Sequence, residues 1–383
     1  MRYSVGIIGG GQLARMMHQA AIGLGIDVRL LAEAEGVSAA QVIPDAFVGD
    51  YTAYDDLARF ARDVQVVTFD HEHVPTKHLR ALEGVEVRPG PDALQYAQDK
   101  ADMRIRLSAL GIDCPDFVVC DDADDAVHFG EERGWPIILK TSRGGYDGKG
   151  VWKIDDAAQV AEVFANKPEV SAGEPVRIVA EEFIDFAREL SALVVRSQSG
   201  QVVAYPISES VQKDGICVET TTPAPGLDPD RAAELQATAI RIAAELGVVG
   251  VLAVELMEAR DGRIVVNELA MRPHNTGHWS IDGAVTSQFD NHIRAVLDLP
   301  LGAPDMLAPV VVMSNVLGGS VEDLTGALQH VYARDRHAHA HLYGKEVRPG
   351  RKVGHVTCLG DDVADVRRRA RHAANHLMGI EDD

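Results

Sequence analysis

The chain has 383 residues, is 46% hydrophobic and 25% charged, and carries a net charge of −21. This composition fits a globular protein of two or three domains, and the acidic excess argues against a nucleic-acid partner, which requires a basic face. Because the chain has no membrane-length apolar run, no signal-peptide pattern and no zinc-like cysteine spacing, we expect a cytoplasmic protein without a membrane partner.

The first hundred residues alternate short apolar strands with helical segments. "YSVGIIG" is a predicted strand, "QLARMMHQAAIGLG" has the apolar spacing of a helix, and "DVRLLAE", "AFVGDY" and "QVVTFD" follow as strands. Such alternation is typical of a parallel sheet covered by helices. The Pro- and Gly-containing stretch "VRPGPDALQ" predicts the end of this Rossmann-like region near residue 95.

The rest of the chain has a different pattern. After a helix over 99–112, the strand "PIILKTS" leads into a glycine-rich loop, and "VRIVAEEFI", "ELSALVVRS" and "QVVAYPISES" alternate as antiparallel strands do. A helix over 229–247 precedes "VLAVELMEA" and "RIVVNELAMR", two strands joined by the turn "ARDGR", and a helix over 281–299 follows. "PVVVMSNVLGG" then begins a smaller terminal region, so three domains are predicted.

The first strand ends in a glycine motif, Gly9-x-Gly11-x-x-Ala14, at the start of a helix. With Glu33 near the end of the second strand, the motif matches the dinucleotide-binding fingerprint and on its own suggests an NAD-dependent oxidoreductase. The alternative is that the glycines only allow the helix to pack closely on the sheet. We favour a bound anion at this junction, whose identity the motif leaves open.

A second glycine loop, "RGGYDGKG" over 143–150, connects two strands and predicts a hairpin tip. Its glycines would allow backbone N–H groups to approach a polyphosphate, and Lys140 on the preceding strand could reach the same charge. It is not a Walker A loop, because Gly150 rather than Ser or Thr follows Lys149. A flexible hairpin tip is the alternative, but such a tip rarely carries Tyr, Asp and Lys together.

Two glutamates, Glu255 and Glu268, lie within strands whose neighbours are apolar. If these strands pair through the "ARDGR" turn, the carboxylates can face each other, and buried carboxylates need a cation. Mg²⁺ suits such oxygen ligands together with Asn267, and it commonly bridges carboxylates to substrate phosphates. The alternative is a pair of solvated glutamates. Combined with Lys140 and its hairpin, the pair predicts an ATP site and a phosphoryl-transfer enzyme.

These motifs resemble those of the ATP-grasp ligases, and within them the N5-carboxyaminoimidazole ribonucleotide synthetase family. The likeness runs along nearly the whole chain and is most specific in "GGYDGKG", "RPHNTGHW" and "YGKEVRPGRKVGH". It implies a mixed α/β and α+β fold of three domains. These are a Rossmann-like pre-ATP-grasp domain over 1–97, a two-lobed ATP-grasp domain over 98–303 with its lid at about 115–182, and a small β-rich domain over 304–383.

The resemblance also implies an activity. ATP would phosphorylate bicarbonate to carboxyphosphate, which would carboxylate the amine of 5-aminoimidazole ribonucleotide in de novo purine synthesis and release ADP and phosphate. The implied cofactors are ATP and Mg²⁺, with neither NAD nor biotin. A homodimer that binds only small-molecule partners is implied as well.

Site residues are implied by matching the family's motifs position by position. Implied ATP contacts are Lys100, Lys140, Gly145, Tyr146, Asp147, Gly148, Lys149, Gly150, Glu181, Glu182, Phe183, Ile184, Glu189, Gln212, Asn267 and Glu268. Implied contacts with the substrate nucleotide are Gly11, Gln12, Glu72, Tyr146, Asp147, Arg272, His274, Asn275, Lys345, Arg351 and Lys352. The implied catalytic residues are Tyr146, Asp147, Lys149, Arg272 and Asn275, and the implied metal ligands are Glu255 and Glu268.

Individual roles follow from the same likeness. "EEFI" would line the adenine and Glu189 would bind the ribose, while Asp147 is the candidate for contact with the amine and for its proton transfer. The cluster "YGKEVRPGRK" would hold the 5′-phosphate, with Lys345 and Arg351 favoured by the family pattern and Arg348 and Lys352 left open by the spacing. His274 and His278 are either titrating groups or packing residues.

The stretch "FDHEHVP", which contains the candidate contact Glu72, and three single positions depart from the family's usual pattern. Lys100 and Lys149 stand where many members have Arg, which keeps the charge but loses the bidentate fork, and Gln212 stands where we expect His. The alternative within the superfamily is another ligase, such as a formate-using glycinamide ribonucleotide transformylase or a biotin carboxylase-like enzyme. Outside it, the alternatives are an NAD-dependent oxidoreductase and a non-catalytic nucleotide-binding protein.

Overall fold

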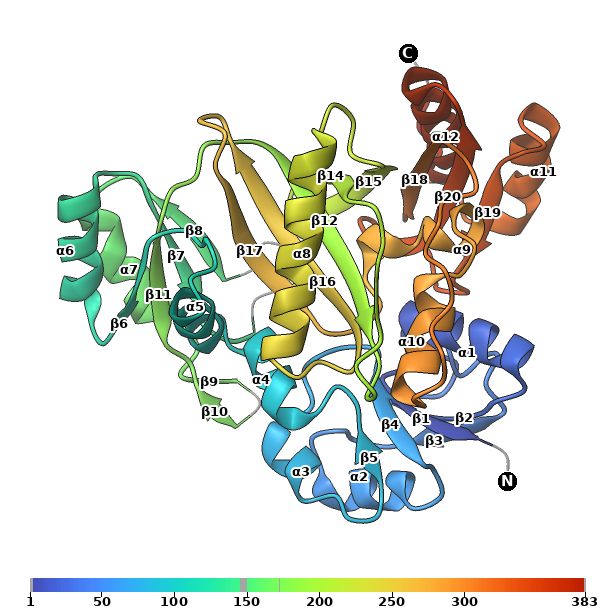
Figure 1. The fold of residues 1–383 in the computed structure, drawn as a ribbon, viewed down its shortest axis with the longest axis horizontal. Coiled ribbons are helices and arrows are strands. Elements are labelled where there is room, and N and C mark those ends of the chain that lie inside the picture. Colours follow the sequence, from blue (N-terminus) through green and yellow to red (C-terminus); the bar gives the residue numbers. More distant parts are fainter. Residues whose placement is uncertain (1–2, 145–149, 172, 382–383) are drawn as a thin grey trace.

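A computed structural model describes residues 3–144, 150–171 and 173–381 of the chain. Most strands in this part of the chain lie in three sheets, which contain five, four and nine strands. Figure 1 shows the N-terminal sheet and the C-terminal region on one side of the molecule and the four-stranded sheet at the opposite end. Among the residues described, no helix combines the length and the apolar character that a bilayer span requires.

The N-terminal sheet is parallel, with the strand order β3-β2-β1-β4-β5. Val5, Ile7 and Ile8 of its central strand are all fully buried, as expected for a parallel strand covered on both faces. The prediction of a parallel sheet over this region is confirmed. Its elements are β1 (Ser4–Ile8), α1 (Gln12–Leu24), β2 (Asp27–Ala32), β3 (Asp45–Val48), α2 (Tyr54–Ala61), β4 (Val66–Phe69), α3 (Thr76–Arg80), β5 (Glu86–Val87) and α4 (Pro91–Gln98).

The four-stranded sheet is antiparallel, with the order β6-β11-β7-β8, and forms a small lobe. Its core joins Phe129 and Val163 of the covering helices to Ile137, Leu139 and Ile178 of the strands. The elements of this part are α5 (Lys100–Ala109), β6 (Phe117–Cys120), α6 (Ala123–Arg133), β7 (Ile137–Thr141), β8 (Val151–Ile154), a 3₁₀ turn (Ala157–Gln159), α7 (Val160–Asn166), β9 (Val170–Ser171), β10 (Glu174–Pro175) and β11 (Ile178–Glu182).

The nine-stranded sheet has the main order β17-β16-β12-β14-β15-β18-β20-β19, and β13 also pairs with β12. Leu252 and Val254 pack in the core that contains α8, whereas Val251 and Ala253 pack toward Trp279 on the other face. This alternation places a core on both sides of β16. The elements up to its midpoint are β12 (Phe186–Arg196), β13 (Val202–Ala204), β14 (Ser208–Lys213), β15 (Ile216–Thr222), α8 (Pro229–Glu245), β16 (Gly250–Ala259), β17 (Ile264–Ala270), a 3₁₀ turn (Asn275–Gly277), α9 (Ser280–Gly283) and α10 (Gln288–Val296).

The C-terminal region extends the same sheet rather than forming a separate one. Its first strand, β18, pairs with β15, and Glu219 is the register partner of Ser314. A core of Val312, Val356, Ala370 and others joins these strands to the last helix. The elements are β18 (Val310–Leu317), α11 (Leu324–Arg334), β19 (His339–Leu342), β20 (Lys352–Gly360) and α12 (Val363–Met378). The helices α11 and α12 were not predicted from the sequence.

Two predicted elements are interrupted in the structure. The strand expected over 201–210 is two strands, β13 and β14, because Pro206 between them lacks an amide hydrogen for the ladder. The helix expected over 281–299 is two helices, α9 and α10. Ser287 begins the second by accepting a hydrogen bond from the backbone N–H of Asp290 at 3.1 Å, as an N-cap residue does.

Candidate active site

Two cavities meet between the N-terminal sheet, the small lobe and the nine-stranded sheet. The inner cavity, of about 480 Å³, faces the N-terminal sheet, and the lobe cavity, of about 490 Å³, lies under the small lobe. The two share the lining residues Lys100, Glu255, Glu268, His274, Asn275 and Lys352. Ligands in the two cavities would therefore meet at these residues.

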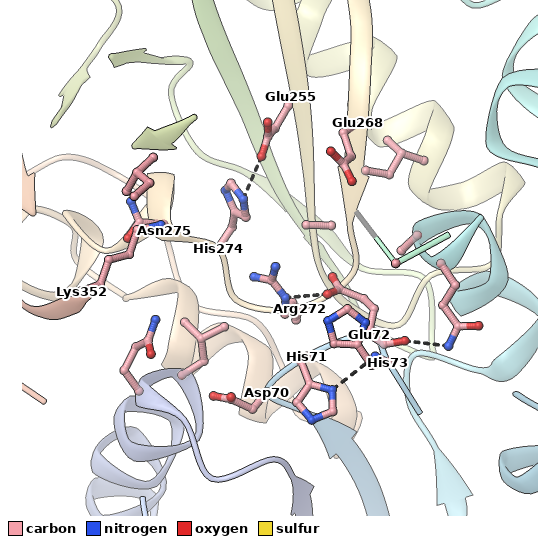
Figure 2. A pocket seen from close by; sticks show the side chains of 18 of the residues that line it. Asp70, His71, Glu72, His73, Glu255, Glu268, Arg272, His274, Asn275 and Lys352 are labelled. Carbon is pink, nitrogen blue, oxygen red and sulfur yellow. Dashed lines mark hydrogen bonds and ion pairs between the residues drawn. The ribbon is translucent and has the colours of Figure 1, made fainter. Parts of the chain in front are cut away.

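Glu255 and Glu268 are register partners across β16 and β17, and a bulge follows Glu255. The prediction that the two carboxylates face each other is confirmed, and Figure 2 shows them side by side on neighbouring strands. Glu255 lies 3.0 Å from Nε2 of His274, and Glu268 accepts a hydrogen bond from Nζ of Lys100 at 2.9 Å. Both carboxylates thus already have a cationic or hydrogen-bonding partner.

Burial alone would raise the pKa of Glu255. The hydrogen bond with His274 and the charges of His274, Arg272 and Lys100 outweigh burial, so the pKa of Glu255 lies below its ordinary value. The carboxylate is therefore an anion at neutral pH, which is the state that a cation ligand requires.

Next to Glu268, Lys140 lies in a buried group of charges. Its Nζ is 2.8 Å from Glu181 and donates to Oδ1 of Asn267 at 3.1 Å. Glu181 also accepts two hydrogen bonds from Arg104, at 2.8 and 3.2 Å, and Arg104 donates to the carbonyl oxygens of Val266 and Asn267. Burial would raise the pKa of Glu181, but Lys140 and Arg104 lower it to about 2. The side chain of Glu181 is thus held by these two cations at the edge of the lobe cavity.

The lobe cavity also has an apolar part and a titrating carboxyl. Apolar lining comes from Ile138, Phe183, Ile184, Phe186 and Met257. Glu189 lines the same cavity, and burial together with the charge of Glu255 raises its pKa to about 7. Gln212 lies there too, with Nε2 donating to Oγ of Ser210 at 3.0 Å.

Arg272 is one of the cations that line the inner cavity. Its Nε donates to Glu72 at 2.7 Å (Figure 2). Glu72 also accepts a hydrogen bond from the backbone N–H of Met271 at 3.1 Å. Burial would raise the pKa of Glu72, but Arg272 lowers it below the ordinary value. The pair joins the N-terminal region to the end of β17 and leaves Arg272 lining the cavity.

The first glycine loop binds the protein's own carboxylates. Gly10 donates to Glu33 at 3.0 Å, and Gly11 and Ala14 donate to Asp70 at 3.2 and 2.8 Å. A Cβ at Gly11 would lie 2.2 Å from Oδ2 of Asp70, so only glycine allows this approach. The anion predicted at this junction is therefore supplied by side chains of the chain itself, and the next residues, Gln12 and Leu13, line the inner cavity.

The C-terminal basic cluster divides into two parts. Lys345, Arg351 and Lys352 line the inner cavity, and Lys345 donates a hydrogen bond to Gln12. Arg348 instead forms an ion pair with Glu346, and its side chain is 65% exposed. The structure thus brings three of the four basic residues to the cavity, and Arg348, which the spacing left open, points elsewhere.

Other predicted positions have different outcomes. Five predicted site residues lie outside the described part of the chain, namely Gly145, Tyr146, Asp147, Gly148 and Lys149. The two residues before them, Arg143 and Gly144, line the inner cavity. His274 lines both cavities. His278 is fully buried and burial lowers its pKa well below 6.5, so it is a neutral packing residue.

Known protein families and individual relatives match this chain along most of its length. Family models match for a "Ribonucleotide synthetase preATP-grasp domain" over residues 2–98, an "ATP-grasp domain" over 105–289 and a "Phosphoribosylaminoimidazole carboxylase C-terminal domain" over 311–369. An N5-carboxyaminoimidazole ribonucleotide synthase of Mycobacterium tuberculosis is 50% identical over 97% of this chain and 87% of its own length. The chain belongs to the N5-carboxyaminoimidazole ribonucleotide synthase family.

Further members of this synthase family are similar in sequence and in structure. The Corynebacterium ammoniagenes synthase is 47% identical over 98% of this chain and 92% of its own. The Thermus thermophilus enzyme has a TM-score of 0.86 at 34% identity, covering 99% of each chain. An Aspergillus clavatus synthase solved with ADP and 5-aminoimidazole ribonucleotide has a TM-score of 0.87 at 29% identity, again over 99% of both chains. The chain therefore has the three-part ATP-grasp fold of this family.

Several residues that line or support the cavities of this family member were not predicted from the sequence. Asp70, His71 and His73 lie at the end of β4, and Arg104 lies behind Lys140. Arg104 follows Lys100 by four residues on α5, so helical spacing alone places both on one face of the helix. That spacing was the available signal for Arg104, whereas Asp70 had none apart from its position after a strand.

Proposed function

We propose that the chain catalyses the ATP- and bicarbonate-dependent carboxylation of 5-aminoimidazole ribonucleotide to N5-carboxyaminoimidazole ribonucleotide. The observation that carries the proposal is the meeting of two cavities at the facing Glu255 and Glu268, in a chain of this synthase family. A reaction that passes a phosphoryl group to one substrate and then a carboxyl group to another needs two adjoining sites.

ATP occupies the lobe cavity in this proposal. The adenine lies along the apolar lining at Glu182–Ile184, and the ribose hydroxyls contact Glu189. Lys140, Lys100 and Asn267 face the phosphates, together with the backbone of the 145–150 loop, most of which lies outside the described residues. Gln212 takes the place of the expected His and offers an amide in its stead.

Glu255 and Glu268, with Asn267, are the residues that would hold Mg²⁺. The donor set fits, because it consists of hard oxygens and because the pKa of Glu255 keeps that ligand ionised. In the described part of the chain no third His, Cys, Asp or Glu completes a metal cluster, so phosphate oxygens and water would supply the remaining ligands. When bound, Mg²⁺ neutralises phosphate charge as the γ-phosphoryl group is transferred.

The inner cavity holds the other two substrates. Lys345, Arg351 and Lys352 bind the 5′-phosphate of the nucleotide, because they form its basic wall. Arg272, His274 and Asn275 lie between this wall and the carboxylate pair, and Figure 2 shows this position for His274 and Asn275. These three residues bind bicarbonate. There a bicarbonate oxygen attacks the γ-phosphorus of ATP, ADP leaves, and carboxyphosphate remains beside Arg272.

In the second step the exocyclic amine attacks the carbonyl carbon of carboxyphosphate, and the bond between that carbon and the bridging oxygen breaks, so that phosphate leaves with the bridging oxygen. The amine loses a proton, for which Asp147 is the proposed acceptor, with Tyr146 and Lys149 also at the reacting groups. Arg272 and Asn275 stabilise the negative charge that builds on the transferred carboxyl group.

The decisive experiment measures ADP release with Mg²⁺-ATP and bicarbonate, with and without 5-aminoimidazole ribonucleotide. Strong stimulation by the nucleotide that requires bicarbonate supports the proposal. Stimulation by glycinamide ribonucleotide and formate instead would assign a different ATP-grasp ligase. As part of the same proposal, the protein is a cytoplasmic homodimer, which sedimentation analysis and cell fractionation test.

A further inference from the structure

The buried group around Lys140 contains an arginine that lines neither cavity among the described residues. Arg104 has no solvent exposure and Glu181 is only 1% exposed. Arg104 holds Glu181 through both carboxylate oxygens and donates to the carbonyl oxygens of Val266 and Asn267, at 3.0 and 2.8 Å. One side chain from α5 thus connects β11 of the small lobe to β17, the strand that carries Glu268.

The charges in this group do not cancel. Arg104 and Lys140 are two cations that share one carboxylate, Glu181, so one positive charge remains. Arg104 makes the bidentate contact, which is the stronger form of such a pair. The excess charge is therefore on Lys140, which lines the lobe cavity, and burial strengthens its field because little water screens it.

Without Arg104 the net charge of this buried group changes. Lys140 would be the sole partner of Glu181 at 2.8 Å, and the pair would be neutral toward the cavity. The carbonyl groups of Val266 and Asn267 would also lose their donor. Because Oδ1 of Asn267 accepts from Lys140, the position of that lysine depends on Arg104 through both the carboxylate and the strand.

We propose that Arg104 is a positioning residue for nucleotide phosphates: it neutralises Glu181 and so leaves the charge of Lys140 available to ATP. This inference rests on the proposed ATP site. It assigns Arg104 a role in phosphate affinity rather than in adenine recognition, because its contacts lead to Lys140 and Asn267 and not to the apolar part of the cavity.

Calorimetric binding of Mg²⁺-ADP and of adenosine to the full-length protein tests the role. Arg104→Met should weaken Mg²⁺-ADP by about 10- to 100-fold, the range for loss of one charge-assisted contact, and leave adenosine within about twofold. Arg104→Lys keeps the charge and should retain most of the affinity. Removing both charges, in Arg104→Met with Glu181→Gln, should recover part of the lost Mg²⁺-ADP affinity, because Lys140 regains its unpaired charge while the carbonyl groups of Val266 and Asn267 still lack their donor.

Equal losses for adenosine and Mg²⁺-ADP in Arg104→Met, or no recovery in the double variant, would overturn the inference and leave Arg104 a purely structural residue. If Arg104→Met does not fold, the double variant decides, since it removes the buried carboxylate together with the arginine that pairs with it. Arg371→Met is the matched control, because Arg371 pairs with the buried Glu219 outside both cavities and should leave nucleotide affinity unchanged.

The wild-type protein separates this inference from the proposed function. Wild type that binds Mg²⁺-ADP but does not carboxylate the nucleotide refutes only the proposed reaction, and the Arg104 comparison still decides the inference. Wild type that fails to bind Mg²⁺-ADP refutes both.

Discussion

Glu189 gives a prediction in which stability and nucleotide binding change in opposite directions. Burial and the charge of Glu255 raise its pKa from 4.5 to about 7 in the folded protein. The folded protein therefore binds this proton more tightly than the unfolded chain, and the ionised carboxylate opposes folding. The penalty is absent below pH 4.5, grows as the pH rises toward 7, and is constant above that.

The size of the penalty follows from the two pKa values. Their difference corresponds to about 3.4 kcal/mol at 1.36 kcal/mol per pKa unit, and the partial exposure of the side chain to solvent reduces this to about 1.5 kcal/mol. Glu189→Gln should thus stabilise the nucleotide-free protein by about 1.5 kcal/mol at pH 8 and by less than about 0.5 kcal/mol at pH 5. It should weaken ATP binding at the same time, because the ribose loses its carboxylate acceptor.

Urea unfolding at both pH values, without nucleotide or Mg²⁺, measures the effect. The exposed Glu83→Gln is the control, and it should change the unfolding free energy at neither pH. A Glu189→Gln protein that is equally stable or less stable than wild type at pH 8 would refute the reasoning, because the carboxylate would then carry no burial penalty.

Three further predictions concern the binding and reaction of the substrates. Lys345→Met should raise the KM for 5-aminoimidazole ribonucleotide at least about tenfold and leave the KM for ATP unchanged in steady-state assays, because Lys345 lines the inner cavity and not the lobe cavity. Glu268→Gln should weaken ADP binding about tenfold with Mg²⁺ but not in EDTA, measured by calorimetry; equal weakening in both would contradict a metal role. Asp147→Asn should lower carboxylation far more than ATP affinity, and equal losses would exclude Asp147 as the proton acceptor.

The features that could be predicted from the sequence are those encoded within a few residues. The turn "ARDGR" joins two apolar strands, so the pairing of Glu255 with Glu268 followed from a stretch of 14 residues. The parallel N-terminal sheet followed in the same way from strand and helix periodicity. Such patterns are local because the side-chain directions of strands and helices repeat at fixed spacings.

The contacts that were missed join distant parts of the chain. Arg104 meets Glu181 across 77 positions, and Asp70 meets Gly11 across 59. Nothing in the residues around Asp70 indicates that its carboxylate accepts hydrogen bonds from the first glycine loop. The sequence shows both Asp70 and Gly11, but only the completed fold brings them into contact. The anion predicted for that loop was therefore assigned to a ligand and not to Asp70.

The continuous sheet has a consequence for how the chain can be divided. The basic residues Lys345 and Lys352 belong to a region whose first strand, β18, lies directly against β15. Cutting the chain before β18 would leave β15 as an open edge with unpaired backbone groups, which is the kind of surface that recruits other chains and aggregates. The basic wall that we propose for phosphate binding is therefore not a removable module, and its attachment through β15 fixes its distance from the carboxylate pair.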